Sequence, residues 1–438
     1  MGRIFQRKNR KGYYLQVAVP RELRKELKTT SIVRKLSNNK SESFSMKKEI
    51  EEKIKKELRD LKNKNLLDKK ESYKDEYDMR IDNLYMKFNH EYFQKNLVLN
   101  EKAMVLSYWH CIGHEADFKE KNSYQIVKFF NLEIIIHNYK GNLWAIENSC
   151  PHRGTKFFNT NRGNSKITCP YHGWTFTPDK AFIPRKDTFK DEKLINDARP
   201  KEWKIRNING LIFISYKPLF SIQEQLGDEV FQIICLIGES IYQNYSSQDI
   251  VFDSNWKIAI ENALEPYHIS MVHKNTLAPL GISNGQNKLY DWASIFHDKI
   301  KSSKLKKTKR LFEKMLKIKF DFEGYWSLYL FPFSMISSTE ATTFAHQLYQ
   351  PSPKLDSTIC LTKLWCMEPN NKKYDESLKC FYKSVSETNL QIFKEDAEIC
   401  SQINIESWNE KPLNFESTLE IKINHFRNCL RKSDKLVN

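Results

Sequence analysis

The sequence predicts an α+β protein in three parts: a basic N-terminal extension (1–75), a β-rich domain (85–216) and a domain that mixes helices with strands (217–438). Two observations support this division. Positive charge is concentrated at the start of the chain. Short β-branched and aromatic segments fill the middle part, and from about residue 252 helical segments alternate with strands. A chain of 438 residues is long enough for two or three domains.

The N-terminal extension carries most of the net charge. Residues 1–75 contain 23 Lys and Arg against 11 Asp and Glu, a surplus of 12 within a net charge of +17. The alternating segment 12–20 predicts a strand, and the charged segment 45–67 predicts a helix with one apolar stripe (Ile50, Ile54, Leu58 and Leu61). This strand–helix order weakly resembles the small N-terminal domain of some phage-type integrases. A solvated basic extension or interaction helix is the favoured interpretation, and binding of nucleic acid through residues 1–75 is the alternative.

Targeting signals and disulfide patterns are absent from the sequence. No run of about 18 apolar residues occurs, so no membrane span is predicted. The basic start MGRIFQRKNRKGYY lacks the apolar region of a secretory signal. Nine scattered cysteines in such a chain predict reduced thiols. We therefore expect a cytoplasmic protein whose specially spaced cysteines are available to bind metal.

Short β segments define the middle domain. IVKFF, EIIIHNY, LWAIEN and LIFISY are rich in β-branched and aromatic residues and are separated by Gly, Asn and Lys. The later part contains strand candidates such as YWSLYLF and TICLTKLWC. A very basic stretch at 299–319 interrupts it and predicts an exposed helical insertion.

Two matched Cys/His pairs form the strongest motif. CPHRG at 150–154 places Cys150 and His152 in one loop, and CPYHGW at 169–174 places Cys169 and His172 in another. Four such ligands suit a zinc ion or an iron–sulfur cluster. Most zinc fingers keep the two Cys together and the two His together, whereas here each pair mixes them. The mixed order favours a Rieske [2Fe–2S] cluster, in which two Cys hold one iron and two His hold the other.

The segment CPHRG…CPYHGWTF resembles the cluster motif of ring-hydroxylating and related Rieske oxygenase α subunits, over roughly residues 85–215. Gly154 and Gly173 would let the backbone approach the cluster, and Trp174 would shield it from water. The motif alone does not establish catalysis, because small Rieske ferredoxins and respiratory Rieske proteins also carry one.

A second candidate metal site begins about ninety residues later, in NWKIAIENALEPYHISMVH. Activation of O2 by iron(II) needs two imidazoles and one carboxylate on one face of the metal. His268 and His273 offer the imidazoles, but five residues of ideal helix rotate a side chain by about 140°. We therefore expect the helix to end or distort between them. Spacing alone is weak evidence, because most histidine pairs of this kind are core or surface residues.

The same segment is similar to the mononuclear-iron helix of Rieske oxygenases. The family pattern E-N-x-x-E/D-x-x-H-x4-H is matched by five residues of this chain: Glu261, Asn262, Glu265, His268 and His273. The resemblance implies one mononuclear Fe(II), held by the two histidines and by an aspartate on a late helix.

That late helix is predicted over SETNLQIFKEDAEICSQIN. The family's aspartate usually follows a glutamate, and Asp396 follows Glu395 here. We assign Asp396 as the third ligand, with Glu395 and Glu398 as the competing choices.

Glu265 is the candidate for a catalytic role beside the metal. It lies three residues before His268, so both side chains can project from one helix face. In the family this carboxylate accepts hydrogen bonds from an iron-ligand histidine and from the cluster histidine of a neighbouring subunit. Carried over, it would link His268 of one chain to His172 of the next. Many ring dioxygenases have Asp at this position, and Glu resembles the branch that acts on quaternary amines such as carnitine and glycine betaine.

The resemblance implies a β-rich Rieske domain followed by a helix-grip (START-like) catalytic domain. It implies an oxygenase that uses O2 to hydroxylate or oxidatively demethylate a small organic substrate, either an aromatic compound or a quaternary amine. A separate flavin-containing NAD(P)H reductase, directly or through a ferredoxin, would supply the electrons, and a homotrimer is expected. A Rieske electron carrier with an inactive second site is the alternative, and the intact triad argues against it.

The catalytic domain should form a sheet around the substrate, with strands in 325–338 and 343–353. Candidate pocket residues, most of which are better interpreted as ordinary core, are Phe331, Phe333, Met335, His346 and Tyr349. Aromatic side chains converging on the iron would favour a trimethylammonium substrate through cation–π contact. The chain departs from the family in its N-terminal extension, in the 299–319 insertion and at 179–189, which lacks the Gly-rich turn often found after the cluster.

Overall fold

The computed structural model describes residues 3–6, 12–19, 24, 28–56, 58, 101–282, 285–299, 302–317, 323–339, 342–405 and 417–437. The chain forms two compact units, residues 1–95 and 96–438. Within the described part of the chain, no helix combines the length and the apolar character needed to cross a membrane.

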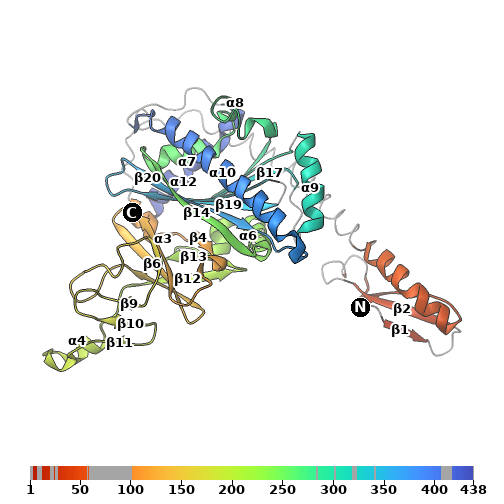
Figure 1. Ribbon diagram of the computed structural model, residues 1–438, viewed down its shortest axis with the longest axis horizontal. Coiled ribbons are helices and arrows are strands. Elements are labelled where there is room, and N and C mark those ends of the chain that lie inside the picture. Colours follow the sequence, from red (N-terminus) through yellow and green to blue (C-terminus); the bar gives the residue numbers. More distant parts are fainter. Residues whose placement is uncertain are drawn as a thin grey trace. The chain divides into compact units, whose positions relative to one another are not determined.

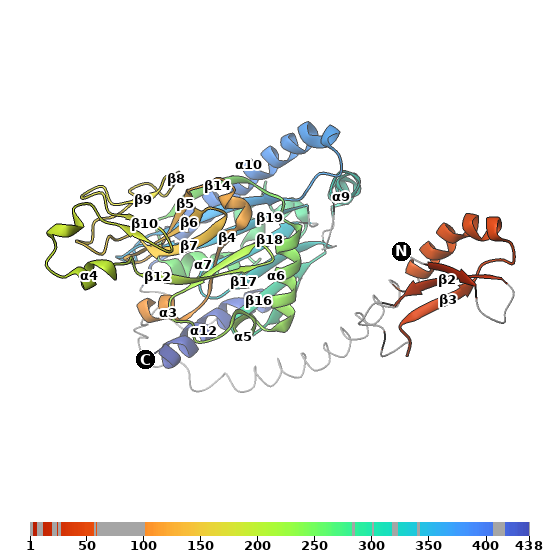
Figure 2. The same cartoon turned by 90° about the horizontal axis from the view of Figure 1, so that it is seen from below.

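The described part of the first unit includes a small antiparallel sheet and a helix that packs against it. Its strands are β1 (Arg3–Gln6), β2 (Tyr13–Ala18) and β3 (Ser31–Lys35), in the order β1-β2-β3, and the helix covers residues 40–56 (Figure 2). Leu15 and Val17 of β2 pack against Ile54 and Leu58. The predicted strand and the apolar stripe are therefore confirmed, except at Leu61, which lies outside the described residues.

The second unit begins with the β-rich part. After α3 (Glu101–Ser107), a seven-stranded antiparallel sheet has the order β4-β13-β12-β7-β6-β5-β8. Its strands are β4 (His110–His114), β5 (Ser123–Phe129), β6 (Leu132–Tyr139), β7 (Asn142–Glu147), β8 (Arg162–Asn164), β12 (Glu202–Ile208) and β13 (Leu211–Ser215). A smaller sheet joins β9 (Ile167–Thr168), β10 (Thr175–Phe176) and β11 (Ala181–Phe182), and α4 (Glu192–Asn196) follows (Figure 1). The four β segments predicted for the middle domain are β5, β6, β7 and β13.

The later part is built on a second antiparallel sheet, with the order β14-β20-β19-β18-β17-β16-β15. These strands are β14 (Gln243–Phe252), β15 (Gln286–Leu289), β16 (Ala293–Asp298), β17 (Tyr325–Leu330), β18 (Ser334–Thr339), β19 (Thr343–Pro351) and β20 (Thr358–Cys366). Its helices are α5 (Ile222–Leu226), α6 (Asp228–Ser240), α7 (Trp256–Leu264), α8 (Ile269–Val272), α9 (Ser303–Met315), α10 (Asp375–Cys400) and α12 (Ile421–Val437). The long helix α10 runs across the sheet (Figure 1), and the mixed architecture confirms the α+β class.

Side chains alternate between the two faces of the sheet along most of β17, β18 and β19. Leu328, Ile336 and Phe344, at even positions, are buried in a core shared with α6. Most of the odd positions line a cavity that is also lined by α10, and Ser338 is the even position that lines it too. Because successive side chains of a strand point to opposite faces, one sheet supplies both a core and a cavity wall.

The basic insertion forms the predicted helix, α9, but part of it is not exposed. Phe312 is 8% exposed and packs in the core that includes Leu378 and Tyr382 of α10. A β-bridge from Leu316 to Pro369 fixes the end of the helix. The predicted helix is confirmed and most of its described side chains are exposed, but one face of α9 packs against apolar partners.

A buried ion pair joins the β-rich part to the second seven-stranded sheet. Asp117 binds Lys363 of β20, and the Trp365 indole N–H donates to the same carboxylate at 3.1 Å. Burial would raise the pKa of Asp117, but the Lys363 ammonium outweighs burial and lowers it. Both parts belong to one compact unit, so the predicted boundary near residue 216 stays a prediction.

Replacing Asp117 with Asn is expected to destabilise the protein by about 3–5 kcal/mol, because the buried Lys363 ammonium loses its counter-ion. The folded-state pKa of Asp117 is lowered, so the stabilisation is present above the unfolded pKa and is lost as pH falls through the folded value. Denaturant unfolding at neutral pH measures the change. The exposed Asp179→Asn control should stay within about 0.5 kcal/mol of the parent. An equally small effect of Asp117→Asn would contradict the prediction.

Candidate functional site

The two Cys/His loops have nearly identical backbone geometry. In each loop the cysteine N–H donates to a carbonyl five residues later, at 2.9 Å for Cys150 and 2.8 Å for Cys169. The glycine N–H donates back to the cysteine carbonyl, at 2.8 Å for Gly154 and 3.0 Å for Gly173. Both glycines have positive φ, +74° and +71°, which side-chain-bearing residues rarely adopt. The repeated glycine in the sequence thus produces two matching loops.

The loops bring together the four side chains that the sequence singled out. Cys150 and Cys169 are buried, and the rings of His152 and His172 lie 4.7 Å apart between centroids. Trp174 stacks on His152 at 4.7 Å, which fits its predicted shielding role. His172 is exposed.

This donor set fits a [2Fe–2S] cluster. The buried Nδ1 of His152 has no hydrogen-bond partner among the described residues, and burial together with the neighbouring His172 lowers the pKa of His152. Burial raises the pKa of the Cys150 thiol to about 11, so a metal is needed to hold it as a thiolate. A Rieske cluster is held by neutral imidazole nitrogens and by cysteine thiolates. The histidine and cysteine side chains of the two loops can supply both kinds of ligand.

His268, His273 and Asp396 form a second cluster. Each of the three residues offers one ligand atom, and these three atoms all lie within 4.8 Å of one another. His273 Nε2 lies 3.0 Å from Asp396 Oδ1 and 3.2 Å from His268 Nε2, and His268 Nε2 lies 3.5 Å from the same oxygen. This small triangle of two imidazoles and one carboxylate suits one face of a non-haem iron.

The helix break that permits this geometry lies earlier than predicted. Helix α7 ends at Leu264, and Glu265 is extended (φ −119°, ψ 143°). His268 and His273 then flank the four-residue helix α8. The prediction that Glu265 and His268 share a helix face was wrong. Glu265 precedes Pro266, and the residue before proline is disfavoured in the helical conformation.

Carboxylates bind the outer nitrogens of both histidines. Glu265 lies 2.5 Å from Nδ1 of His268, and Glu395 lies 2.7 Å from Nδ1 of His273. The Thr276 hydroxyl donates to Glu395 at 2.9 Å and steadies that carboxylate. Such partners fix the tautomer and orientation of a metal-binding imidazole.

These contacts distinguish among the three carboxylates of α10 that were candidates for the third metal ligand. Asp396 is buried and joins the two histidines, and it also accepts a hydrogen bond from Asn262 at 2.7 Å. Glu395 binds the far side of His273. Glu398 is exposed. The geometry therefore supports Asp396 as the ligand.

The triad stabilises positive charge at its centre. Burial would lower the pKa of His268, but hydrogen bonds to Asp396 and Glu265 raise it to about 9. Burial would raise the pKa of Asp396, but its hydrogen bonds with the two histidines lower it to about 2. A divalent cation would take the place of the protons held there, so the residues present fit a metal ion.

Replacing Glu395 with Ala is expected to weaken metal binding by about 10–100-fold, because His273 loses the partner that orients it. Competition with a chromophoric chelator for Fe(II) measures the affinity. Glu398→Ala removes an exposed carboxylate from the same helix and should leave the affinity unchanged. A Glu395→Ala protein that binds Fe(II) as tightly as the Glu398→Ala protein would contradict this role.

Glu261, which matches the family pattern, has a different partner. Its carboxylate accepts two hydrogen bonds from Arg427, at 2.6 and 2.8 Å. The pair joins α7 to α12 and is largely buried. This contact could not be predicted from the sequence, because Arg427 lies 166 residues away from Glu261.

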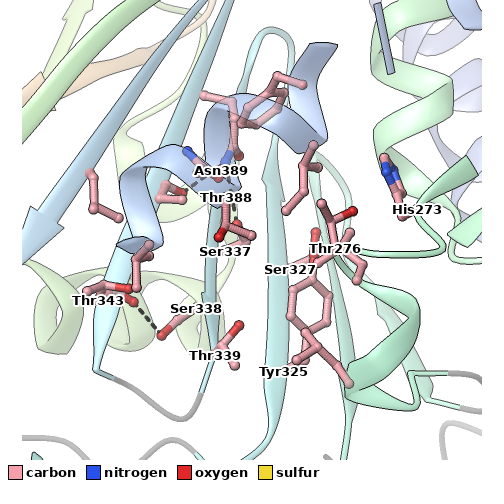
Figure 3. A pocket seen from close by; sticks show the side chains of 18 of the residues that line it. His273, Thr276, Tyr325, Ser327, Ser337, Ser338, Thr339, Thr343, Thr388 and Asn389 are labelled. Carbon is pink, nitrogen blue, oxygen red and sulfur yellow. Dashed lines mark hydrogen bonds between the residues drawn. The ribbon is translucent and has the colours of Figure 1, made fainter. Parts of the chain in front are cut away.

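The triad opens on a cavity of about 280 Å³ (Figure 3). Of the five pocket candidates, Met335 and Tyr349 line it. Phe331, Phe333 and His346 do not, and they lie buried elsewhere. His346 is on the opposite face of β19, where its ring stacks on Trp365 at 4.8 Å.

Several other residues of the cavity wall were not among the candidates predicted from the sequence. Polar side chains come from the strands and from α10, and α9 adds one lysine: Ser327, Ser337, Thr339, Thr343, Thr388, Asn389 and Lys309. The period-two pattern of β17–β19 was a signal that could have found the strand residues.

Two family models match the chain. The Rieske [2Fe-2S] domain matches residues 108–187, and the ring hydroxylating alpha subunit (catalytic domain) matches residues 240–433. The large subunit of 2-halobenzoate 1,2-dioxygenase from Burkholderia cepacia is 30% identical over 185 residues, 40% of each chain. The carnitine monooxygenase oxygenase subunit from Acinetobacter pittii is 25% identical over 181 residues, 40% of this chain and 48% of that protein. The chain thus matches less than half the length of these curated relatives.

Solved structures show the same fold. A quaternary ammonium Rieske monooxygenase superposes with a TM-score of 0.61 at 18% identity, covering 78% of this chain and 93% of that one. A mutant of naphthalene 1,2-dioxygenase bound to phenanthrene gives a TM-score of 0.61 at 16% identity, covering 77% of this chain and 89% of that one.

Proposed function

We propose that this chain, which belongs to the Rieske oxygenase α-subunit family, uses O2 and electrons from a separate reductase to hydroxylate or oxidatively demethylate a small organic substrate. When bound, the [2Fe–2S] cluster would supply electrons, and the mononuclear iron would supply the redox chemistry that activates O2.

One observation carries the proposal. The same chain holds two matched Cys/His loops and a His268–His273–Asp396 triangle that opens on a cavity. Relatives that act on aromatic compounds or on carnitine support it. An electron carrier would need the loops but neither the triangle nor the cavity, so the oxygenase is preferred to that alternative.

The protein's own residues have separate tasks in this scheme. His268, His273 and Asp396 would hold the iron from one side and leave the cavity side open for O2 and substrate. Glu265 and Glu395 keep the outer imidazole nitrogens protonated and the rings oriented. Apolar side chains in the cavity wall, including Ile269, would limit the entry of water.

The electron route to the triad forms the finer part of the proposal. His172 is exposed, and Glu265 lies beside His268. A homotrimer in which His172 of one chain approaches Glu265 of the next would give a short path. Sedimentation of the iron-loaded protein tests the trimer, and a monomer with full activity would contradict it.

The expected partners and location complete the proposal. A flavin-containing NAD(P)H reductase, with or without a ferredoxin, would deliver the electrons. A cytoplasmic location is part of the proposal, and it rests on the scattered cysteines of the sequence, which predict reduced thiols. Binding of nucleic acid by residues 1–75 stays a prediction.

Reductase-coupled O2 uptake tests the activity. Purified iron-loaded protein is mixed with NADH and a Rieske-oxygenase reductase, and substrate-dependent O2 uptake is measured together with the hydroxylated or demethylated product. Product that incorporates label from ¹⁸O2 is the expected result. Reduction and reoxidation of the cluster without product, over a broad panel of aromatic and amine substrates, would favour the electron carrier.

A further inference from the structure

Two fully buried tyrosines of the second seven-stranded sheet differ in the partners of their hydroxyls. Tyr329 of β17 is 0% exposed and Tyr349 of β19 is 1% exposed. The Tyr329 hydroxyl donates to the Pro332 carbonyl at 2.8 Å. The Tyr349 hydroxyl has no hydrogen-bond partner among the residues that the structure describes. Because an unpaired buried hydroxyl costs free energy, the partner of Tyr349 is expected to be a molecule other than the protein itself.

The cavity beside the triad is where that partner can bind. Tyr349 lines the cavity of about 280 Å³, together with Asp396, whereas Tyr329 does not line it. Burial raises the pKa of the Tyr349 phenol well above its usual value, and Cys360 and Asp396 add to this effect. The phenol therefore keeps its proton and can donate a hydrogen bond to a molecule in the cavity.

The other tyrosine of the cavity wall already has a partner. Tyr325 lines the cavity, and its phenol shares a hydrogen bond with the Ser327 hydroxyl. Figure 3 shows both of these side chains on the wall of the pocket. Tyr349 is thus the tyrosine of this wall whose hydroxyl is left for a ligand.

Much of the remaining wall is apolar. It includes side chains from the sheet, from α8 and from α10, among them Met335, Leu364, Ile269, Ile392 and Phe393. Such a wall favours an apolar ligand body, and the Tyr349 hydroxyl adds one point of polar recognition. In the absence of a ligand, water can accept the hydrogen bond. A ligand that displaces this water must therefore offer an acceptor in its place.

We infer that Tyr349 determines substrate specificity by donating one hydrogen bond to an oxygen atom of an otherwise apolar molecule, such as a ring that carries a carbonyl group. The inference rests on the proposed function, which places the substrate in this cavity. A hydrocarbon of the same shape would displace water from the hydroxyl and leave it unpaired. A site of this kind discriminates against a ligand that lacks the required acceptor.

Calorimetric titration of the full-length, iron-loaded protein tests the inference without any turnover. The two probes are acetophenone, which carries a carbonyl oxygen, and α-methylstyrene, in which a CH2 group replaces that oxygen. Tyr349→Phe removes the hydroxyl and keeps the ring. The ratio of the two affinities, acetophenone over α-methylstyrene, should fall by about 3–10-fold in this variant, as expected for the loss of one neutral hydrogen bond. The hydration of the free probes cancels from the comparison, because the same pair is used with both proteins.

Tyr329→Phe is the matched control, because it removes a buried hydroxyl of the same sheet that has a partner in the protein and does not line the cavity. It should lower Tm by about 1–3 °C and leave the affinity ratio unchanged. Tyr349→Phe should leave Tm unchanged or raise it, because the variant loses no hydrogen bond within the described part of the protein.

An unchanged affinity ratio in Tyr349→Phe, or an equal fall in Tyr329→Phe, would overturn the inference. A Tm for Tyr349→Phe as low as that of Tyr329→Phe would give the hydroxyl a structural role and overturn it too. So would failure of the iron-loaded parent to bind acetophenone at millimolar concentration. Iron content is measured first on every sample. A parent protein that holds no mononuclear iron would count against the proposed function, whereas any of the other outcomes in an iron-loaded parent counts only against the role of Tyr349.

Discussion

Replacing Asp396 with Ala is expected to remove the mononuclear iron and to leave the cluster in place. The substitution deletes the only carboxylate of the triangle and leaves His268 and His273 as a two-ligand site. Iron should fall from about three to about two atoms per chain, with about two sulfides retained. Substrate-dependent O2 uptake should fall by at least about 10³-fold, because the metal's contribution of several kcal/mol is lost.

The control for this experiment is Glu398→Ala, which removes an exposed carboxylate two residues later on the same helix. It should retain all the iron and full O2 uptake. An Asp396→Ala protein that keeps about three irons would show that another residue, with Glu395 as the nearest candidate, is the third ligand.

Replacing Cys169 with Ala is expected to remove the cluster and to leave the mononuclear iron in place. The cluster loses one of the two thiolates on its sulfur-ligated iron, so acid-labile sulfide should fall to near zero and about one iron should remain. The Rieske-type EPR signal after dithionite reduction should disappear. O2 uptake should fall to background, because electrons no longer reach the triad.

Cys235→Ala is the matched control, since Cys235 is a partly exposed thiol on α6 and belongs to neither site. It should retain sulfide, signal and uptake. Retention of two sulfides by the Cys169→Ala protein would show that the second loop does not bind the cluster.

The cluster loops could be predicted from the sequence because their information is local. Each loop places its cysteine, histidine and glycine within five residues, and the positive φ of Gly154 and Gly173 depends only on the loop itself. Hydrogen bonds within the loop then set the geometry. Short-range chemistry of this kind leaves a motif that can be recognised without knowledge of the fold.

The triad was only partly predictable. The positions of His268 and His273 came from the family pattern, and the structure brings them together with Asp396 from 123 residues away. The position of the helix break was missed although Pro266 marked it. The ring of Pro266 disfavours a helical backbone at Glu265, the residue before it. We instead expected one helix to include both Glu265 and His268.

The cavity could not be predicted in the same way. Whether a strand residue faces the core or the cavity depends on how α10 packs over β17–β19, and these segments lie far apart in the sequence. His346 shows the consequence: it lies one residue from Gln347, which lines the cavity, yet it faces Trp365 on the other side of the sheet. A register assignment that is wrong by one residue exchanges the two faces.

The most direct test of the central claim is the count of iron and acid-labile sulfide per chain in anaerobically purified protein, with an EPR spectrum after dithionite reduction. We expect about three irons and two sulfides, together with a Rieske-type signal. Two irons with the same signal, unchanged by added Fe(II), would leave an electron carrier without a mononuclear site. Zinc in place of iron, with no sulfide, would contradict the account altogether.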